Sequence, residues 1–241
     1  MKNTVVITGA GISVESGIQP FRGKNGLWNE NPTEMATYRN YRMNTSSFLQ
    51  WYFHRFVSCK DALPNKAHEI LAKSNVKVIT QNIDNLHIKA KHSLDCLIEI
   101  HGNINFKRKI HAQYRNELIW ANWDAVNENN LEEDLFELFH IQRDGTIDEN
   151  KSERPHILLF DEYYTELYQY EEAHQWMDAA DTIIFIGTSN SVGFTYGALQ
   201  MAVNNGKKII VVDPNPAPSF YQPGVEIIQS TATEFCEKFF I

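Results

Sequence analysis

The segment Thr4-Val5-Val6-Ile7-Thr8-Gly9-Ala10-Gly11-Ile12-Ser13 joins a short apolar run directly to a glycine-rich turn. Glycine allows a tight turn and lets a phosphate group approach the amides of the element that follows. The same pattern also occurs at ordinary strand–helix turns, so alone it is a weak signal. Gln81-Asn82-Ile83-Asp84 and His101-Gly102 each follow another apolar run. Polar side chains at the strand ends of an open α/β sheet are typical of a nucleotide site.

Further apolar runs resemble strands that are covered on both faces, because they are rich in Val and Ile and do not alternate with polar residues. The expected strands are Thr4–Thr8, Val76–Thr80, Leu97–Ile100, Ile157–Phe160, Thr182–Ile186, Ile209–Val212 and Val225–Ile228. Helices are expected over Tyr170–Ala180 and over Thr195–Asn204, the second ending before Asn205-Gly206. Alternating strands and helices predict an α/β fold with a Rossmann-like, doubly wound parallel sheet.

Two stretches interrupt this alternation. Residues 31–71 are helix-like and aromatic, whereas residues 106–153 begin basic and become acidic. We interpret both as insertions that form a smaller lobe against the sheet. The prediction is one domain over residues 1–241. Its Rossmann-like lobe comprises 1–30, 72–105 and 154–241, and its small lobe comprises 31–71 and 106–153.

Composition excludes several classes of protein. The 22 basic and 30 acidic residues give a net charge of −8 without a basic block, which argues against a nucleic-acid partner. The apolar runs are only as long as strands, so no membrane span is expected. The first strand begins too early to leave room for a signal peptide. Three widely spaced cysteines fit a reducing cytoplasm, where we expect the protein to be located.

The segment after the glycine turn carries Phe21, Arg22 and Trp28. An arginine beside such a turn can bind phosphate oxygens with its planar fork, although a structural surface loop with a core Phe is the alternative. The acidic residue expected about twenty positions after a dinucleotide turn is missing, because Glu30 does not follow a strand. A dehydrogenase is therefore disfavoured.

At this point the chain resembles the sirtuins, the NAD-dependent protein deacylases. The matching segments occur in the family's order and span nearly the whole chain: GAGISVESGIQPFRG at Gly9–Gly23, TQNIDNLH at Thr80–His87, EIHG at Glu99–Gly102, RPHILLFDE at Arg154–Glu162 and GTS at Gly187–Ser189. The resemblance implies that NAD is a consumed co-substrate. It also implies that the partner is an acyl-lysine protein and that the products are nicotinamide and O-acyl-ADP-ribose.

The resemblance also implies the roles of individual residues. His101 would be the general base, since a histidine near neutral pKa can take a proton from a ribose hydroxyl. Without the resemblance, a satisfied core or surface histidine is the ordinary alternative. Asn82 would act in catalysis beside the nicotinamide ribose, and Asp84 would accept a hydrogen bond from the carboxamide. The complete expected cofactor set is Gly9, Ala10, Gly11, Ile12, Phe21, Arg22, Trp28, Gln81, Asn82, Ile83, Asp84, Gly187, Thr188, Ser189, Asp213, Asn215 and Ala232.

The chain departs from the family in the small lobe. Sirtuins commonly hold a structural zinc on two Cys-x-x-Cys pairs, but no cysteine lies between Gly102 and Arg154. His111 and His140 do not make a closed site, so no metal is expected. The lobe is instead expected to pack around apolar side chains, namely Phe106, Tyr114, Trp120, Trp123, Leu131, Leu135, Phe136 and Phe139, with a helix through Leu131, Leu135 and Phe139.

Substrate binding is expected at two places. Phe160-Asp161-Glu162 replaces the family's F-G-E, a loop that pairs with the substrate backbone. Tyr52 and Arg55 align with the residues that bind acidic acyl groups in class III sirtuins, which this chain resembles most. A phenol and a guanidinium on one helix face could hold the carboxylate of a succinyl or malonyl group. The alternative is that Tyr52 belongs to the core.

These observations favour a lysine deacylase that acts without zinc. An NAD hydrolase or ADP-ribosyl transferase would use the same nicotinamide pocket with another acceptor, and the altered peptide loop favours it. A binding module without catalysis is disfavoured, since a binder needs neither His101 nor Asn82. The oligomeric state is not predicted.

Overall fold

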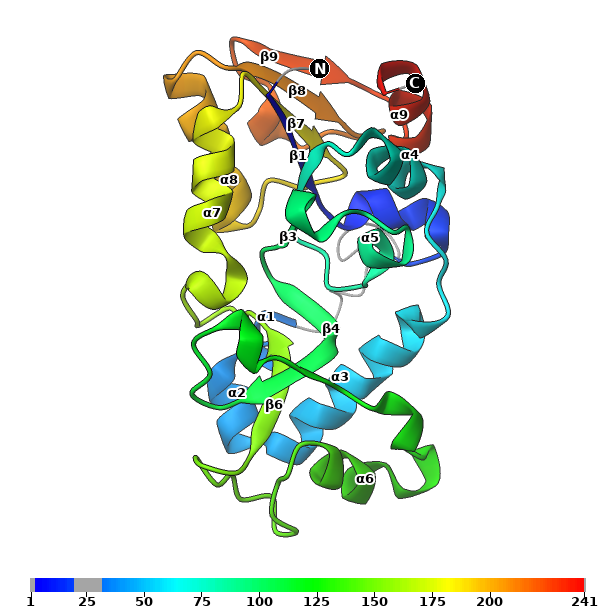
Figure 1. Ribbon diagram of the computed structural model, residues 1–241, viewed down its shortest axis with the longest axis vertical. Helices are drawn as coiled ribbons and strands as arrows, with labels where there is room; N and C mark the ends of the chain where they lie inside the picture. Colours follow the sequence, from blue (N-terminus) through cyan, green and yellow to red (C-terminus); the bar gives the residue numbers. More distant parts are fainter. Residues whose placement is uncertain (1–2, 20–31, 241) are drawn as a thin grey trace.

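The computed structural model describes residues 3–19 and 32–240. Its larger sheet has six parallel strands in the order β3-β2-β1-β7-β8-β9 (Figure 1). The strands are β1 (Thr4–Thr8), β2 (Lys77–Thr80), β3 (Leu97–Glu99), β7 (Thr182–Ile186), β8 (Lys208–Val212) and β9 (Val225–Ile228). The order reverses beside β1, since β2 and β3 lie on one side of it and β7 to β9 on the other. This confirms the predicted doubly wound α/β fold.

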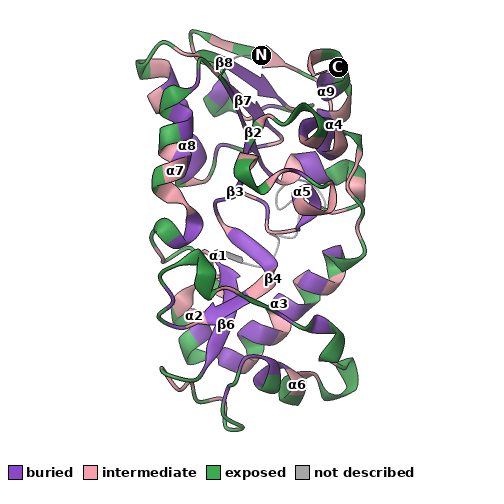
Figure 2. Ribbon diagram, viewed as in Figure 1, coloured by how far each residue is buried: buried purple, intermediate pink, exposed green. Residues whose placement is uncertain are grey.

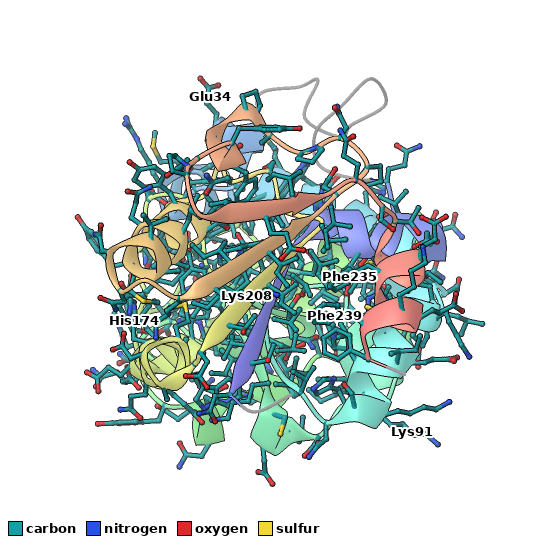
Figure 3. The ribbon with its side chains drawn as sticks, turned by 90° about the horizontal axis from the view of Figure 1, so that it is seen from above. Glu34, Lys91, His174, Lys208, Phe235 and Phe239 are labelled. Carbon is teal, nitrogen blue, oxygen red and sulfur yellow. The ribbon has the colours of Figure 1, made fainter. Side chains whose placement is uncertain are left out.

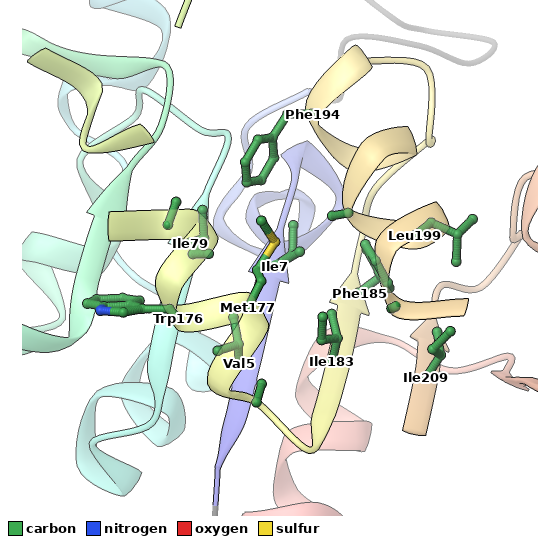
Figure 4. Close-up of a cluster of buried hydrophobic side chains, with 14 of the residues drawn as sticks. Val5, Ile7, Ile79, Trp176, Met177, Ile183, Phe185, Phe194, Leu199 and Ile209 are labelled. Carbon is green, nitrogen blue, oxygen red and sulfur yellow. The ribbon is translucent and has the colours of Figure 1, made fainter. Parts of the chain in front are cut away.

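Both faces of this sheet are buried because consecutive apolar side chains of each strand point to opposite faces. Val5 and Ile7 of β1 belong to one core cluster, together with Met177 and Phe185 (Figure 4). Val6 belongs to a second cluster on the other face. The strands β1, β2, β3, β7 and β8 therefore form the interior, as the unbroken Val and Ile runs predicted (Figure 2). The edge strand β9 differs from that prediction, because its side chains are half-buried or exposed.

Helices cover the two faces in two layers, seen end-on in Figure 3. The first cluster packs under α7 (Tyr170–Ala179) and α8 (Gly193–Asn204), and the second under α4 (Lys66–Ser74) and α9 (Ala232–Phe239). Capping boxes start α4, at Asn65, and α9, at Thr231. Helix α8 begins two residues before the predicted Thr195 and ends at Asn204 as expected.

The smaller sheet is antiparallel, in the order β5-β4-β6, and lies at the far end of the molecule (Figure 1). Its strands are β4 (Gly102–Lys109), β5 (Ile119–Trp120) and β6 (Glu153–Ile157). The remaining α-helices are α1 (Pro32–Met35), α2 (Tyr38–Met43), α3 (Thr45–Lys60), α5 (Leu86–Lys89) and α6 (Leu131–Leu138). Short 3-10 helices lie at Ala10–Ser16, Leu94–Cys96, Arg115–Glu117, Trp123–Ala125, Glu128–Asn130, Glu166–Tyr168 and Pro218–Phe220.

The predicted parallel strand Ile157–Phe160 is wrong. Strand β6 ends at Ile157 and pairs antiparallel with β4. The apolar run is explained by the second core, because Ile157 and Leu159 are buried in the small-lobe cluster while Phe160 is exposed. Strand β4 begins at Gly102, four residues before the expected start of the insertion. The lobe boundaries therefore stay a prediction.

The small-lobe core is organised around Trp123. Its indole stacks on Phe56 at a centroid distance of 4.6 Å, and its Nε1 donates to the carbonyl of Ile104 at 3.0 Å. Leu135 and Phe139 are buried there, as predicted. Part of that expected core is wrong: Trp120 and Tyr114 are exposed on the surface.

A buried carboxylate adds an ionic element to this lobe. Glu153 of β6 accepts from Lys107 at 2.6 Å and from Lys109 at 3.1 Å, both on β4. These two partners lower the pKa of Glu153, although its burial opposes them. These two ion pairs link β4 to β6. The buried carboxylate of Glu153 requires them, because a desolvated charge without a partner is costly. Across the described residues, no helix has the length and apolar character needed to cross a membrane.

Candidate active site

The sequence-predicted segments meet at the carboxyl edge of the larger sheet. The amide of Gly9 donates to the carbonyl of Ile186 at 3.1 Å, and the amide of Gln81 donates to Thr8 at 2.9 Å. The amide of Ile100, beside His101, donates to the carbonyl of Thr80 at 3.0 Å. The ends of β1, β2, β3 and β7 are therefore joined directly, as the predicted nucleotide edge requires.

The glycines of this edge are required by close approach of two backbone segments. A Cβ on Gly11 would lie 2.5 Å from the Cα of Gly187, and one on Gly9 would lie 2.8 Å from its oxygen. Gly187 itself has a φ of +61°, and the amide of Gly11 donates to its carbonyl at 2.9 Å. The first turn thus presses against the end of β7. This packing explains both glycines before any ligand is considered.

Asn82 and Asp84 share a partner that the sequence analysis did not select. The Asn82 amide donates to the carbonyl of Gly9 at 3.0 Å and to Ser13 Oγ at 3.1 Å. Ser13 Oγ then donates to Asp84 at 2.6 Å. Ser13 was quoted in the turn motif, but its type and spacing gave no signal for this bridging role. The three side chains form one continuous hydrogen-bonded chain from the glycine turn to the β2 loop.

Asp84 is held on its other side by its own loop. Its second oxygen accepts from the amide of Leu86 at 3.0 Å. Burial raises the pKa of Asp84, and the hydrogen bond from Ser13 opposes that effect. Next to it, Asn85 adopts a φ of +66° and accepts from Asn103 at 2.8 Å. A fixed carboxylate at this position can accept hydrogen bonds from a ligand amide.

His101 is oriented through both ring nitrogens. Its Nδ1 lies 2.9 Å from the carbonyl oxygen of Gln81, and its Nε2 lies 2.9 Å from the hydroxyl of Tyr164. A carbonyl only accepts, so Nδ1 carries the proton of the neutral ring. Burial lowers the pKa of His101 to about 4. The imidazole is therefore neutral at physiological pH, and the expected near-neutral pKa is wrong.

The residue after His101 connects the site to the small lobe. Gly102 has a φ of +89°, and a Cβ there would lie 2.1 Å from the carbonyl oxygen of His156 on β6. The carbonyl of His101 accepts from the amide of Leu158 at 2.9 Å. Strand β4 therefore leaves the candidate base without an intervening loop.

The loop after β7 contributes two buried polar atoms. Thr188 Oγ1 and Asn190 Oδ1 are buried and lack a hydrogen-bond partner in the described part of the chain. Ser189 follows Thr188 and is exposed. Gln81 accepts from Thr195 of α8 at 2.8 Å, which fixes its side chain beside this edge. The first two atoms lie at the edge where a polar ligand would provide partners.

The last three expected cofactor residues are farther along the same edge. Asp213 directly follows β8, and its carboxylate accepts from the amide of Asn215 at 2.8 Å. Burial raises the pKa of Asp213. Ala232 is the buried first residue of α9 and belongs to the core cluster on that face of the sheet. Phe21, Arg22 and Trp28 lie outside the described residues.

A pocket joins the glycine turn, the β2 loop and helix α3. Its lining is Ala10, Ser13, Ile18, Gln19, Arg55, Ser58, Cys59, Asn82, Ile83, Asp84 and Ile104. Arg55 therefore lines the same pocket as Asn82 and Asp84. A wider hollow at the opposite edge of the sheet, around Asn75 and Trp176, includes none of the predicted site residues. We take the first pocket as the site because the polar groups converge there.

Tyr52 is part of the small-lobe core, as its alternative interpretation required. Its ring is fully buried and stacks on the ring of Phe48 at a centroid distance of 6.4 Å. The centroid distance to Trp123 is 5.9 Å. Its hydroxyl, however, is buried without a hydrogen-bond partner among the described residues. Arg55, one turn along α3, is half-buried, and burial lowers its pKa.

The expected peptide loop is tied to its own chain. The amide of Phe160 donates to the carbonyl of Ala36 at 3.0 Å. Asp161 accepts from the amide of Arg39 at 3.0 Å, and Glu162 accepts from Arg154 at 2.6 and 2.9 Å. The two acidic side chains therefore have structural partners within the small lobe.

Comparisons with known proteins agree on one family. A model described as "Sir2 family" matches residues 9–193. An NAD-dependent protein deacylase of Bacteroides thetaiotaomicron is 31% identical over 243 residues, covering 99% of this chain and 96% of the relative. A solved Sir2 homolog–NAD complex is 27% identical, with a TM-score of 0.76 and coverage of 98% and 87%. A solved Sir2–p53 peptide–NAD+ complex is 26% identical, with a TM-score of 0.77 and coverage of 98% and 91%.

Replacing Gly187 by alanine is expected to destabilise the protein through the contact that organises this edge. The new Cβ would lie 2.5 Å from the amide nitrogen of Ile12. We expect a loss of about 3 kcal/mol, from overpacking added to the left-handed backbone. Gly206→Ala is the matched control, because Gly206 has a φ of +62° but open space around it. It should cost about 1 kcal/mol. Urea unfolding measures both, and equal losses would contradict the role of close approach.

Proposed function

The chain belongs to the Sir2 family, and we propose that it prefers lysine substrates whose acyl group ends in a carboxylate, such as succinyl or malonyl. The protein is an NAD-dependent protein deacylase. The observation that carries the proposal is the buried hydroxyl of Tyr52, which has no hydrogen-bond partner among the described residues and lies one helical turn from Arg55.

The residues at the sheet edge fit a dinucleotide. The buried oxygens of Thr188 and Asn190 lack partners among the described residues, and Asp213 offers a carboxylate farther along the edge. We infer that these groups hold the adenosine end, while Asn82 and Asp84 hold the nicotinamide end. When bound, NAD supplies the ribose carbon from which nicotinamide leaves and to which the acyl oxygen bonds.

The protein's own chemistry is positioning and one proton transfer. Asp84, fixed by Ser13 and by the Leu86 amide, would orient the carboxamide. Asn82 would place the ribose or a water beside the reacting carbon. His101 is neutral and protonated at Nδ1, so its Nε2 can accept the proton of a ribose hydroxyl. A pKa near 4 makes the base fully available at neutral pH but weak, since the driving force for proton transfer falls with its pKa.

Tyr52 and Arg55 would recognise the end of the acyl chain. A buried hydroxyl without a partner costs roughly 1–3 kcal/mol, which a ligand oxygen would offset. Arg55 lines the pocket of Asn82 and Asp84 and brings a positive charge to it. A carboxylate in the pocket could accept from Arg55, and one that reached past the lining into the core could also accept from the Tyr52 hydroxyl. An acetyl group would leave the hydroxyl unpaired.

One observation favours a second candidate function. The Phe160 amide is already bonded to Ala36, and Asp161 and Glu162 are bonded within the small lobe. If a peptide could not pair with this loop, the same pocket would transfer ADP-ribose to water or to another acceptor. An NAD hydrolase or ADP-ribosyl transferase is therefore the alternative.

Mass spectrometry of the NAD products tests the proposed function. With a succinyl-lysine or malonyl-lysine peptide we expect O-acyl-ADP-ribose, nicotinamide and free lysine. His101→Ala should abolish product formation while calorimetry still detects NAD binding, because the base acts after NAD has bound. Asn82→Ala should instead slow the release of nicotinamide. ADP-ribose formed equally well without a peptide would support the hydrolase.

Arg55→Met should reduce kcat/KM for succinyl-lysine by roughly ten- to a hundredfold, because a charge-assisted hydrogen bond is worth about 1.5–3 kcal/mol. The activity on acetyl-lysine should change far less. Tyr52→Phe should act in the same direction but more weakly, since only a hydroxyl is lost. Steady-state kinetics on paired peptides measures both variants. Equal losses on acidic and neutral acyl groups would assign the pair to packing alone.

We also propose that the small lobe folds without zinc. The described residues contain no group of three or more metal-ligating side chains suited to a metal ion. His111 pairs with Glu149 at 3.1 Å, and His140 pairs with Glu153 at 3.2 Å. Elemental analysis should find no stoichiometric zinc, and a chelator should leave the melting temperature unchanged. One zinc per chain, with unfolding on chelation, is the contrary result.

A further inference from the structure

The catalytic nitrogen of His101 already has a partner in this fold. Because the carbonyl of Gln81 fixes the proton on Nδ1, the neutral ring keeps one lone pair, on Nε2. Tyr164 lies 2.9 Å from that nitrogen, so its hydroxyl must be the donor. Any other hydroxyl reaches the base only by displacing the phenol or by passing a proton through it.

The packing around Tyr164 distinguishes these two possibilities. Its ring stacks on Tyr170 of α7 at a centroid distance of 5.2 Å and an interplanar angle of 18°. The ring centroid of Phe194 of α8 lies 5.8 Å from that of Tyr164, and the ring centroid of His101 lies 5.9 Å from it. Phe194 is itself buried in the core cluster beneath the sheet edge. The phenol ring is thus held on three sides, and displacing it would break these aromatic contacts.

We propose that Tyr164 is a further catalytic residue that relays the proton from the ribose hydroxyl to His101. The inference rests on the proposed function, because it takes His101 as the base. As the ribose O–H bond breaks, its proton bonds to Tyr164 Oη. The Tyr164 O–H bond breaks in the same step, and that proton bonds to His101 Nε2. The electron pair left on the ribose oxygen forms its bond to the acyl carbon, and the π pair of the bond between that carbon and the lysine nitrogen moves onto the nitrogen. The phenol is unchanged, and His101 becomes an imidazolium.

The environment supports a concerted transfer. Burial raises the pKa of Tyr164 well above that of a free phenol, so a tyrosinate is not a resting species. Tyr164 also follows Glu162 by two residues, on the segment that links the small lobe to α7. Glu162 is anchored by Arg154, which fixes that end of the segment. The relay is therefore built into the junction of the two lobes.

Tyr164→Phe tests the relay, because it keeps the ring and removes only the hydroxyl. We expect kcat for the acyl-lysine peptide to fall about a hundredfold, the lower range for losing a proton-transfer group. The Kd for NAD should be unchanged by calorimetry. In the protein without ligands, NMR should show a higher pKa for His101, since the neutral imidazole loses a hydrogen-bond donor. The wild type should show a curved proton inventory, because two protons move, and the variant a linear one.

Tyr163→Phe is the matched control, because Tyr163 is the adjacent tyrosine and its side chain is 89% exposed. It should leave kcat and the pKa of His101 unchanged. The relay is overturned if Tyr164→Phe matches the wild type in kcat or in the pKa of His101. It is also overturned if the variant is faster, because the phenol would then only block access to His101. His101→Ala separates the two proposals. If it stays active, the assigned base and the relay both fail. If it is inactive while Tyr164→Phe is normal, only the relay fails.

Discussion

The contact between the glycine turn and the end of β7 is the constraint on which the site depends. Gly11 and Gly187 approach so closely that neither tolerates a Cβ. This approach places Ser13 where it can bridge Asn82 and Asp84. It also joins the two halves of the doubly wound sheet at the point where the strand order reverses. The geometry of the hydrogen-bonded chain through Asn82, Ser13 and Asp84 therefore follows from backbone packing before any ligand binds.

Much of the fold could be predicted because burial on both faces leaves a clear pattern in the strands. Val5, Val6 and Ile7 all face apolar clusters, so the run is continuous. The same pattern misassigned Ile157–Phe160, because a run of apolar residues does not say which core buries it. Trp120 and Trp123 show the same limit. Only the second is buried, and the difference comes from tertiary contacts that sequence spacing does not encode.

The candidate site was predictable only in part. The motifs brought Asn82, Asp84 and His101 together, because all three follow parallel strands. Ser13 and Tyr164 were not selected, since a serine after a glycine turn and a tyrosine in a loop are common. Their roles depend on hydrogen bonds over 71 and 63 residues of sequence separation. The lowered pKa of His101 could not be predicted from the sequence either, because its main cause is burial in the folded protein.

Gly102 has a mechanical consequence. It allows β4 to start directly at the candidate base and to run into the aromatic core around Trp123. The amino end of β4 therefore adjoins His101, and the rest of the strand packs in the small lobe. A ligand that tightens that lobe would change the orientation of the imidazole, and binding at the sheet edge would in turn stiffen the lobe. Coupling of this kind is reciprocal in free energy. Substitutions in the distant lobe could thus alter the orientation of His101 while every residue at the sheet edge stays the same.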